Sequence, residues 1–322
     1  MGTDQAVTAR LRAAGCVFAE DEAALLTAAA HTPAELDAMV ERRAGGEPLE
    51  QVVGWAEFCG LRILVDPGVF VPRRRSEFLV SVAVGLARER RARLAADSGP
   101  PVIVDLCCGA GALGLAVAAE LGRDAGPRAD APASGSRPGE AGLTGVTGGP
   151  DLARGAGSAA AASGTGAPSL AWIPGHAGLA ELHAADLDPA AVACARRNVE
   201  PAGGHVYAGD LFAALPRSLR GRIDVLICNA PYVPTAEIPF MPAEARDHEA
   251  RMALDGGADG LAVLRRVTAE APGWLAPGGV LLVETSERQA PSMAAVMSAA
   301  GLTCRVRRDD EYGATVVTGR LG

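Results

Sequence analysis

Long apolar runs are missing from this sequence, and its N-terminus has no basic segment followed by an apolar one. A membrane-spanning helix needs roughly 20 apolar residues in a row, and a secretory signal needs that N-terminal pattern. We therefore expect a soluble, cytoplasmic protein with no membrane association.

Clustered metal ligands are also missing. The seven cysteines include no CxxC pair, and the five histidines are scattered along the chain. Zinc sites need grouped ligands, and several of the cysteines fall inside apolar runs. We expect reduced, buried thiols and no metal site.

Basic charge is scarce relative to acidic charge. The chain has 30 Lys and Arg against 38 Asp and Glu, so its formal net charge is −8. A nucleic-acid-binding protein usually shows a basic footprint, and the chain as a whole offers none, although a local basic patch stays open. Direct nucleic-acid binding is not expected.

The chain is long enough for more than one folding unit. It has 322 residues and is 49% hydrophobic, which allows a large buried core. Helical spacing over residues 4–44, with Thr32 as an N-cap before Pro33, predicts a helical module at 1–48. Short β-rich pieces at 52–58 and 61–65 predict a hairpin within a linker at 49–75.

A segment at 123–178 interrupts the remaining part, 76–322. It consists mostly of Gly, Ala, Ser and Pro, and Trp172-Ile173 is its only candidate anchor. Such a composition cannot bury enough apolar surface to offset the entropy of ordering, so we predict a disordered insertion. Without it, the expected elements follow one another as a βαβ unit.

Polar residues stand at the ends of the buried-type strands expected in 76–322. These strands cover 101–106, 179–186, 205–208 and 223–228, and they lead into Asp105, Asp186, Asp210 and Asn229. A glycine turn and a helix follow the first strand, as in the opening unit of a nucleotide-binding α/β fold. A strand at 280–284 and a terminal hairpin complete the expected sheet.

Each of the three acids suits a different part of a nucleoside ligand. Asp105 would repel a pyrophosphate and attract an ammonium or sulfonium group. Asp186 takes the position that hydrogen-bonds a ribose diol, although Asp188 is an N-cap candidate and could divide that work. Asp210, with apolar Leu211 next to it, suits an adenine.

Gly109, Gly111 and Gly114 also match GxGxxG, the dinucleotide fingerprint. That string alone is weak evidence. An NAD-dependent oxidoreductase would leave the polar tetrapeptide Asn229-Ala230-Pro231-Tyr232, directly behind the strand at 223–228, without a role.

The strand ends and this tetrapeptide together resemble the class I S-adenosylmethionine-dependent methyltransferases, and the AsnXaaProTyr element resembles those that methylate a planar nitrogen. With the stretch Gly68–Arg73, the hairpin and the helical module, the chain resembles the protein glutamine N5-methyltransferases of the release-factor, HemK-type family. The resemblance covers nearly all of the chain except the insertion. It implies an α/β, Rossmann-like fold with a mostly parallel seven-stranded sheet and a terminal antiparallel hairpin. It also implies a monomer that uses S-adenosyl-L-methionine and methylates a glutamine in the GlyGlyGln loop of a peptide chain release factor.

The resemblance also assigns roles to residues. The Asn229 side-chain oxygen and the backbone carbonyl of Ala230 would accept the two N–H groups of the target amide, and Tyr232 would cover its plane. The implied catalytic residues are Asn229, Ala230, Pro231 and Tyr232. The implied cofactor-binding residues are Asp105, Cys107, Gly109, Gly111, Asp186, Leu187, Asp210, Leu211 and Asn229. The implied substrate-binding residues are Phe70, Pro72, Arg73, Asn229, Tyr232 and Glu249.

The chain departs from the family pattern in three places. Ala230 stands where the family usually has proline, and Cys107 replaces the first glycine of the glycine-rich loop. Arg74 and Arg75 replace the usual proline and glutamate. Three alternatives therefore stay open: an adenine N-methyltransferase, a small-molecule methyltransferase, and a catalytically silent S-adenosylmethionine-binding protein.

Overall fold

The computed structural model describes residues 3–93, 99–123 and 180–322. The insertion expected at 123–178, including Trp172-Ile173, lies outside these residues except for Arg123 at the end of a helix. The prediction of disorder for this segment is therefore not tested.

A seven-stranded sheet forms the centre of the molecule, and its strand order is β5-β4-β3-β6-β7-β9-β8. The pairs among β3, β4, β5, β6 and β7 are parallel, whereas β9 runs antiparallel to both of its neighbours. The strands are β3 (Val102–Leu106), β4 (Glu181–Asp186), β5 (His205–Ala208), β6 (Ile223–Cys228), β7 (Leu275–Thr285), β8 (Thr303–Asp309) and β9 (Ala314–Arg320). This confirms the predicted Rossmann-like sheet with its terminal antiparallel hairpin.

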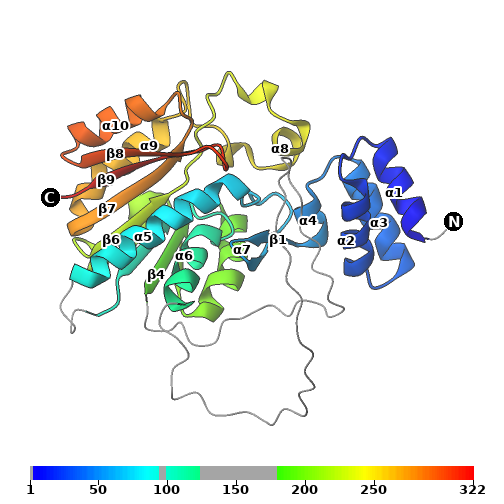
Figure 1. The fold of residues 1–322 in the computed structure, drawn as a ribbon, viewed down its shortest axis with the longest axis horizontal. Helices are drawn as coiled ribbons and strands as arrows, with labels where there is room; N and C mark the ends of the chain where they lie inside the picture. The colour runs from blue at the N-terminus through cyan, green and yellow to red at the C-terminus, as the bar shows by residue number, and fades with distance from the viewer. Residues whose placement is uncertain (1–2, 94–98, 124–179) are drawn as a thin grey trace, which may run out of the picture.

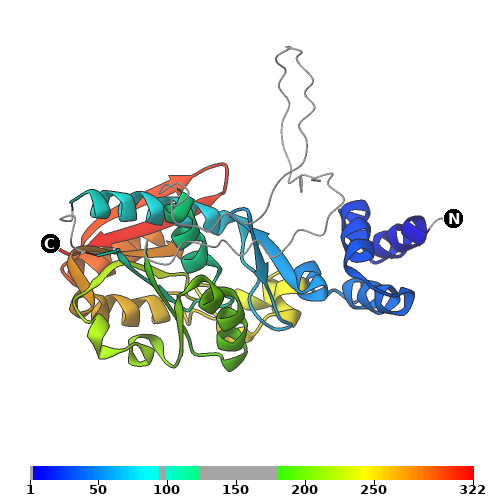
Figure 2. The ribbon, with the colours of Figure 1, turned by 90° about the horizontal axis from the view of Figure 1, so that it is seen from below.

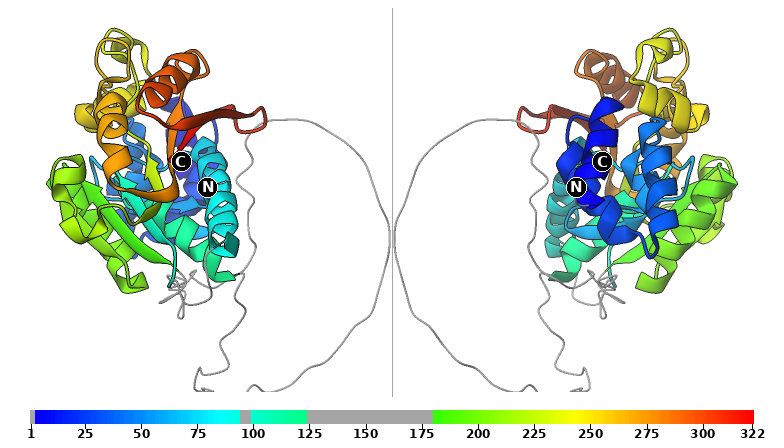
Figure 3. Two further views of the ribbon diagram at one scale, coloured as in Figure 1. Left: turned by 90° about the vertical axis from the view of Figure 1, so that its left-hand side faces the viewer. Right: turned by 90° about the vertical axis from the view of Figure 1, so that its right-hand side faces the viewer.

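Helices cover both faces of the sheet (Figure 1, Figure 3). One apolar core includes residues of α5 (Glu77–Arg93), α6 (Ala112–Arg123) and α7 (Pro189–Val199). The other includes residues of α9 (Ala262–Glu270) and α10 (Ala290–Ala299). Successive residues of β6 alternate between these cores, so the strand is buried on both faces and reads as a continuous apolar run.

The strand order reverses between β3 and β6, and this reversal determines where a ligand can bind. β4 and β5 lie on one side of β3, while β6 and β7 lie on the other. In open parallel sheets of this kind, ligands bind outside the carboxyl ends of the strands at the reversal point. Here Leu106 pairs with Cys228, so the segments that follow β3 and β6 leave the sheet side by side.

The N-terminal helices lie at the end of the molecule away from the C-terminus (Figure 2). They are α1 (Thr3–Ala13), α2 (Ala19–Ala29) and α3 (Pro33–Ala44). They enclose a small apolar core of their own that includes Leu11, Leu26 and Val40. The Thr32 side chain accepts a hydrogen bond from the Glu35 backbone N–H at 3.1 Å, which confirms the predicted N-cap.

The predicted hairpin is present but shorter than expected. Its strands are β1 (Trp55–Phe58) and β2 (Leu61–Leu64), whereas residues 49–53 form the short helix α4 (Leu49–Val53). The prediction of a strand at Val52-Val53 was therefore wrong. The apolar pair belongs to a helical turn that Gly54 ends in a left-handed conformation, with φ 83°, and Val52 packs in the N-terminal core.

Two further features differ from the expected elements. The segment between β6 and α9 contains a further helix, α8 (Ala243–His248), and β7 begins at Leu275, before the strand expected at 280–284. The structure also has 3-10 turns at Arg74–Ser76, Glu200–Ala202, Leu211–Ala214, Arg217–Leu219, Ile238–Phe240, Arg251–Ala253 and Ala271–Gly273. No helix in the described part of the chain is long and apolar enough to cross a membrane.

Candidate active site

A cavity lies at the carboxyl ends of β3, β4 and β6, where the strand order reverses. It is lined by residues from the hairpin exit, the loops after β3, β4, β5 and β6, the segment 250–254, and α9. The predicted site residues that line it are Phe70, Pro72, Arg73, Cys107, Gly109, Asp186, Leu187, Asp210, Leu211, Asn229, Ala230, Pro231 and Tyr232. Asp105, Gly111 and Glu249 are not among the lining residues.

The glycine-rich loop between β3 and α6 turns sharply against the cavity. Gly109 and Gly111 have φ angles of 55° and 78°, and Cys107 has a φ of 56°, a region that L-residues with side chains rarely occupy. Cys107 therefore occupies a position suited to glycine, as its departure from the family pattern suggests. A hydrogen bond with the neighbouring Cys228, followed by burial, raises the pKa of the Cys107 thiol.

Asp105 binds the first turn of α6, directly after this loop, and does not line the cavity. It is fully buried, and its Oδ2 accepts a hydrogen bond from the Gly114 backbone N–H at 2.8 Å. A Cβ at Gly114 would lie only 3.0 Å from the Asp105 Cβ, so glycine is needed for this approach. The expectation that Asp105 faces a charged ligand directly does not fit this position. Burial raises the pKa of Asp105 to about 7, and its Oδ1 has no partner among the described residues.

The side chains of Asp186 and Asp188 have different positions and partners. Asp186 lines the cavity, and its Oδ2 accepts from the Gly109 backbone N–H at 2.8 Å. Asp188 accepts from the Ala190 backbone N–H at 2.9 Å and so caps α7. Leu187 between them is 53% exposed at the cavity. The Asp186 Oδ1 also accepts from the Asp188 backbone N–H at 2.9 Å. A carboxylate has about four acceptor positions, so Asp186 retains acceptor capacity for a ribose diol.

Asp210 lies farther along the same rim of the cavity. Its Oδ2 pairs with Arg266 Nη2 on α9 at 2.7 Å, and both residues line the cavity. Leu211, which follows, is buried and has a φ of 49°. An acid next to a buried apolar residue can bind an adenine through its amine and its ring. The sequence did not predict a role for Arg266, because this residue lies on a helix far from Asp210 along the chain.

Asn229 is oriented by a hydrogen bond from its amide nitrogen. Its Nδ2 donates to Oγ of Ser76 at 3.2 Å, and Ser76 is buried in the 3-10 turn directly before α5. This bond turns Oδ1 away from Ser76. In the described part of the chain, no donor reaches Asn229 Oδ1 or the Ala230 carbonyl oxygen. Two consecutive residues at the cavity therefore present hydrogen-bond acceptors without protein donors.

Tyr232 is held at both its side chain and its backbone. Its hydroxyl donates to Glu284 Oε1 at 2.9 Å, and Gln289 Nε2 donates to its carbonyl oxygen at 2.9 Å. Arg75 Nε also donates to Glu284 Oε1, at 3.1 Å, and its guanidinium lies 5.7 Å from the centre of the Tyr232 ring. Burial, followed by the charge of Glu284, raises the pKa of Tyr232, so the phenol stays protonated and remains a donor.

Phe70, Pro72 and Arg73, from the segment 68–73, form another part of the cavity wall. The Arg73 guanidinium lies 4.8 Å from the centre of the Phe70 ring, and its Nη2 is 2.6 Å from both carboxylate oxygens of Glu249. The Glu249 side chain is 0% exposed. The expectation that Glu249 contacts a substrate does not fit this position, because the buried carboxylate does not line the cavity and binds Arg73.

The sequence-based interpretation missed four residues that orient the predicted ones: Ser76, Arg266, Glu284 and Gln289. Glu284 had a usable signal, because it ends the strand expected at 280–284 and the same rule identified the other polar strand ends. The other three become neighbours of the site only through the folding of distant segments.

No protein-family model matches the chain. Its curated relatives include the release factor glutamine methyltransferase of Geobacter sulfurreducens, 32% identical over 90% of this chain and 80% of the relative. The enzyme of the same name from Streptomyces coelicolor is 32% identical over 78% of this chain and 67% of the relative. A further relative from Streptomyces pristinaespiralis, 29% identical over 81% of this chain and 70% of its own, is a 4-amino-L-phenylalanine/4-methylamino-L-phenylalanine methyltransferase.

Among solved structures, the ribosomal protein L11 methylase of Lactobacillus delbrueckii subsp. bulgaricus is 12% identical over 81% of this chain and 86% of that chain. Its TM-score is 0.41. Similarity at this level supports no functional argument, so the fold assignment depends on the strand order described above.

Proposed function

The chain belongs to the release factor glutamine methyltransferase family, and from this premise we propose its reaction. It transfers the methyl group of S-adenosyl-L-methionine to the side-chain amide nitrogen, N5, of a glutamine in a peptide chain release factor. The target is the glutamine of the GlyGlyGln loop. A release factor acts at the end of translation, which agrees with a cytoplasmic protein.

The observation that carries this proposal is the pair of acceptors at Asn229 Oδ1 and Ala230 O, which have no described donors. A primary amide has two N–H groups and one nitrogen that must point at the methyl carbon. Two fixed acceptors hold both N–H groups and thereby determine the direction of the nitrogen. The Ala230 acceptor belongs to the backbone, so the replacement of proline by alanine in the tetrapeptide preserves it.

The residues at the cavity also fit the methyl donor. Asp186 and Asp210 supply acceptors for a ribose diol and an adenine amine, and the exposed side chain of Leu187 supplies an apolar surface between them. The donor's sulfonium supplies an activated methyl group and a neutral thioether leaving group. Asp105 contributes indirectly, through its hydrogen bond to Gly114 in the first turn of α6, the helix that follows the glycine-rich loop.

The protein's task in the reaction is positioning. The amide nitrogen is a weak nucleophile, because its lone pair is delocalised into the carbonyl group. As the N–C bond forms and the C–S bond breaks, the acceptors at Asn229 and Ala230 stabilise the positive charge on the N–H groups. The nitrogen then releases one proton to solvent, so no strong base is required. Tyr232, held by Glu284, covers the amide plane.

We also propose that the helical module at 1–48 takes part in recognising the protein substrate, and that 49–75 links it to the catalytic part at 76–322. Support comes from an ion pair of 3.1 Å between Arg43 on α3 and Glu244 on α8, which precedes the cavity wall residues at 250–254. We further propose that the protein acts as a monomer and binds no nucleic acid directly. Size-exclusion chromatography with light scattering tests whether the protein is a monomer.

The experiment that tests the proposed function supplies labelled S-adenosyl-L-methionine together with one acceptor at a time. The acceptors are a purified release factor, ribosomal and messenger RNA, duplex DNA, and free 4-amino-L-phenylalanine, the last because of the relative with that substrate. Label on the release factor is expected. Label only on nucleic acid or only on the free amino acid would contradict the proposal.

A further inference from the structure

The cavity wall formed by residues 68–73 is anchored from behind at two points. We propose that Gln51 and Glu249 are positioning residues that hold this wall, and with it Phe70 and Arg73, in place for the target glutamine. We further propose that Arg42 and Arg43 connect both anchors to the N-terminal helices. This inference deepens the proposed function and rests on it.

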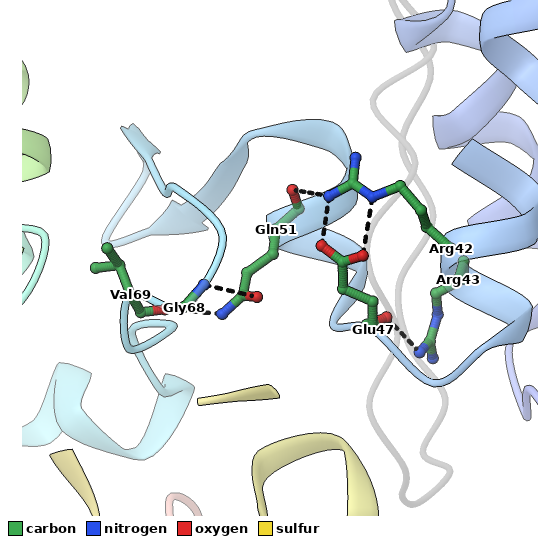
Figure 4. A network of polar contacts seen from close by, with 6 residues as sticks. All are labelled: Arg42, Arg43, Glu47, Gln51, Gly68 and Val69. Carbon is green, nitrogen blue, oxygen red and sulfur yellow. Dashed lines mark hydrogen bonds and ion pairs between the residues drawn. The ribbon is translucent and has the colours of Figure 1, made fainter. Parts of the chain in front are cut away.

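The first anchor is the side chain of Gln51 on α4. Its Nε2 donates to the Val69 carbonyl oxygen at 2.9 Å, and its Oε1 accepts from the Gly68 backbone N–H at 3.2 Å (Figure 4). Gln51 is only 3% exposed and does not line the cavity. Both ends of the amide thus bind the backbone of two adjacent residues, Gly68 and Val69, directly before Phe70.

Arginine side chains connect this anchor to α3. Arg42 donates from Nη2 to the Gln51 carbonyl oxygen at 3.2 Å and from Nε to Glu47 Oε2 at 2.8 Å. Arg43 donates from Nη1 to the Glu47 carbonyl oxygen at 3.0 Å. Figure 4 shows these contacts as a continuous path from the N-terminal helices to Val69.

The second anchor is Glu249, directly after α8. Its Oε1 accepts from the Val71 backbone N–H at 3.2 Å, and both of its oxygens bind Arg73. Five residues earlier, Glu244 pairs with Arg43. The Arg43 side chain is 12% exposed and also pairs with Glu22 at 2.7 Å. Arg43 therefore contacts Glu47, which binds the Arg42 side chain next to Gln51, and Glu244, which lies on the helix before Glu249.

The two anchors hold alternate parts of one short segment. Gln51 holds the peptide groups of residues 68 and 69, and Glu249 holds residues 71 and 73, so Phe70 lies between fixed points. Neither anchor lines the cavity, so each must act through the wall. A displacement of about 1 Å at a positioning group can reduce the rate of an enzyme by about a hundredfold.

The test uses the full-length protein with Gln51→Met, which keeps the length of the side chain and removes both hydrogen bonds. Glu249→Gln tests the second anchor independently, since it keeps an acceptor for Val71 and removes the charge facing Arg73. Arg10→Ala serves as the control, because Arg10 pairs with Asp37 at 2.8 Å on the exposed side of the N-terminal helices. For each protein, backbone hydrogen exchange, S-adenosyl-L-methionine affinity, and kcat and KM with a release factor are measured.

We expect faster exchange, by about tenfold or more, confined to residues 68–73 in both anchor variants. We also expect kcat/KM to fall by roughly 10- to 100-fold while cofactor affinity stays within about twofold of the wild type. Exchange and kcat/KM equal to those of Arg10→Ala would overturn the inference. A loss of cofactor affinity in step with activity would overturn it as well, because it would indicate a general structural role. A wild-type protein that methylates no release factor would instead refute the proposed function, and the exchange measurement would still decide whether the anchors hold the wall.

Discussion

The hydroxyl of Tyr232 donates a hydrogen bond to Oε1 of Glu284 over 2.9 Å. Glu284 lies near the carboxyl end of β7, is 2% exposed, and receives a second hydrogen bond from Arg75. The aromatic ring at the cavity is thus attached to the neighbouring strand. Arg75, which replaces the glutamate usual in the family, offsets the buried charge of Glu284.

Tyr232→Phe should reduce kcat by about tenfold and leave cofactor affinity unchanged, because the ring stays but loses its attachment. The buried carboxylate of Glu284 also loses a donor, which should cost about 1 to 3 kcal/mol in the free energy of unfolding. The matched control is Tyr207→Phe, which removes a hydroxyl 3.0 Å from His183, away from the cavity lining. A normal kcat in Tyr232→Phe, measured with saturating release factor, would refute the role of this bond.

Ser76→Ala should lower kcat by about five- to tenfold, because the Asn229 amide loses the acceptor that orients it. The affinity for S-adenosyl-L-methionine should not change. Ser81→Ala, at an exposed position of the neighbouring helix α5, removes a hydroxyl that donates to the Phe78 carbonyl oxygen, and it should behave as the wild type. Equal activity in the two variants would show that Asn229 does not depend on Ser76.

The sequence predicted the sheet and the residues at its strand ends, because buried strands and turns leave local patterns. It failed where position depends on tertiary contacts. Asp105 ends its strand as expected, yet α6 covers it through Gly114. Glu249, expected among the substrate-binding residues, is buried against Arg73. Ser76 and Arg266 reach the site through tertiary contacts that no local pattern encodes.

Gly260→Ala should destabilise the protein by about 2 to 4 kcal/mol and strongly reduce activity. Gly260 has a φ of 77°, and an added Cβ would lie 2.2 Å from the Tyr232 carbonyl oxygen. Gly273→Ala is the control, since nothing lies within 4 Å of its Cβ position. Urea unfolding and a transfer assay measure both effects. If the two variants had the same stability, the close approach at Tyr232 would be ruled out.

Asp105→Asn should change how stability depends on pH. Burial raises the pKa of Asp105 to about 7 in the folded protein, against about 3.9 in an unfolded chain. Between these values the folded state holds a proton that the unfolded state has released, so wild-type stability falls as the pH rises. Asparagine has no carboxyl group, so the stability of the variant lacks this dependence on pH.

The variant should therefore gain stability relative to the wild type between about pH 4 and pH 7, by at most about 4 kcal/mol, with no further change above pH 7. Urea unfolding at pH 5, 6 and 8 measures the difference. A constant difference across these pH values would show that Asp105 titrates normally.

The central claim is that Asn229 and Ala230 hold a glutamine amide for methyl transfer. The most direct test incubates a release factor with S-adenosyl-L-methionine and either wild-type or Asn229→Ala protein, and locates the methyl group by peptide fragmentation. The account predicts a methyl group on the glutamine side-chain nitrogen with the wild type. With Asn229→Ala it predicts a loss of at least about a hundredfold in transfer, while cofactor affinity stays within a few-fold. A methyl group on any other atom, or full transfer by Asn229→Ala, would contradict it.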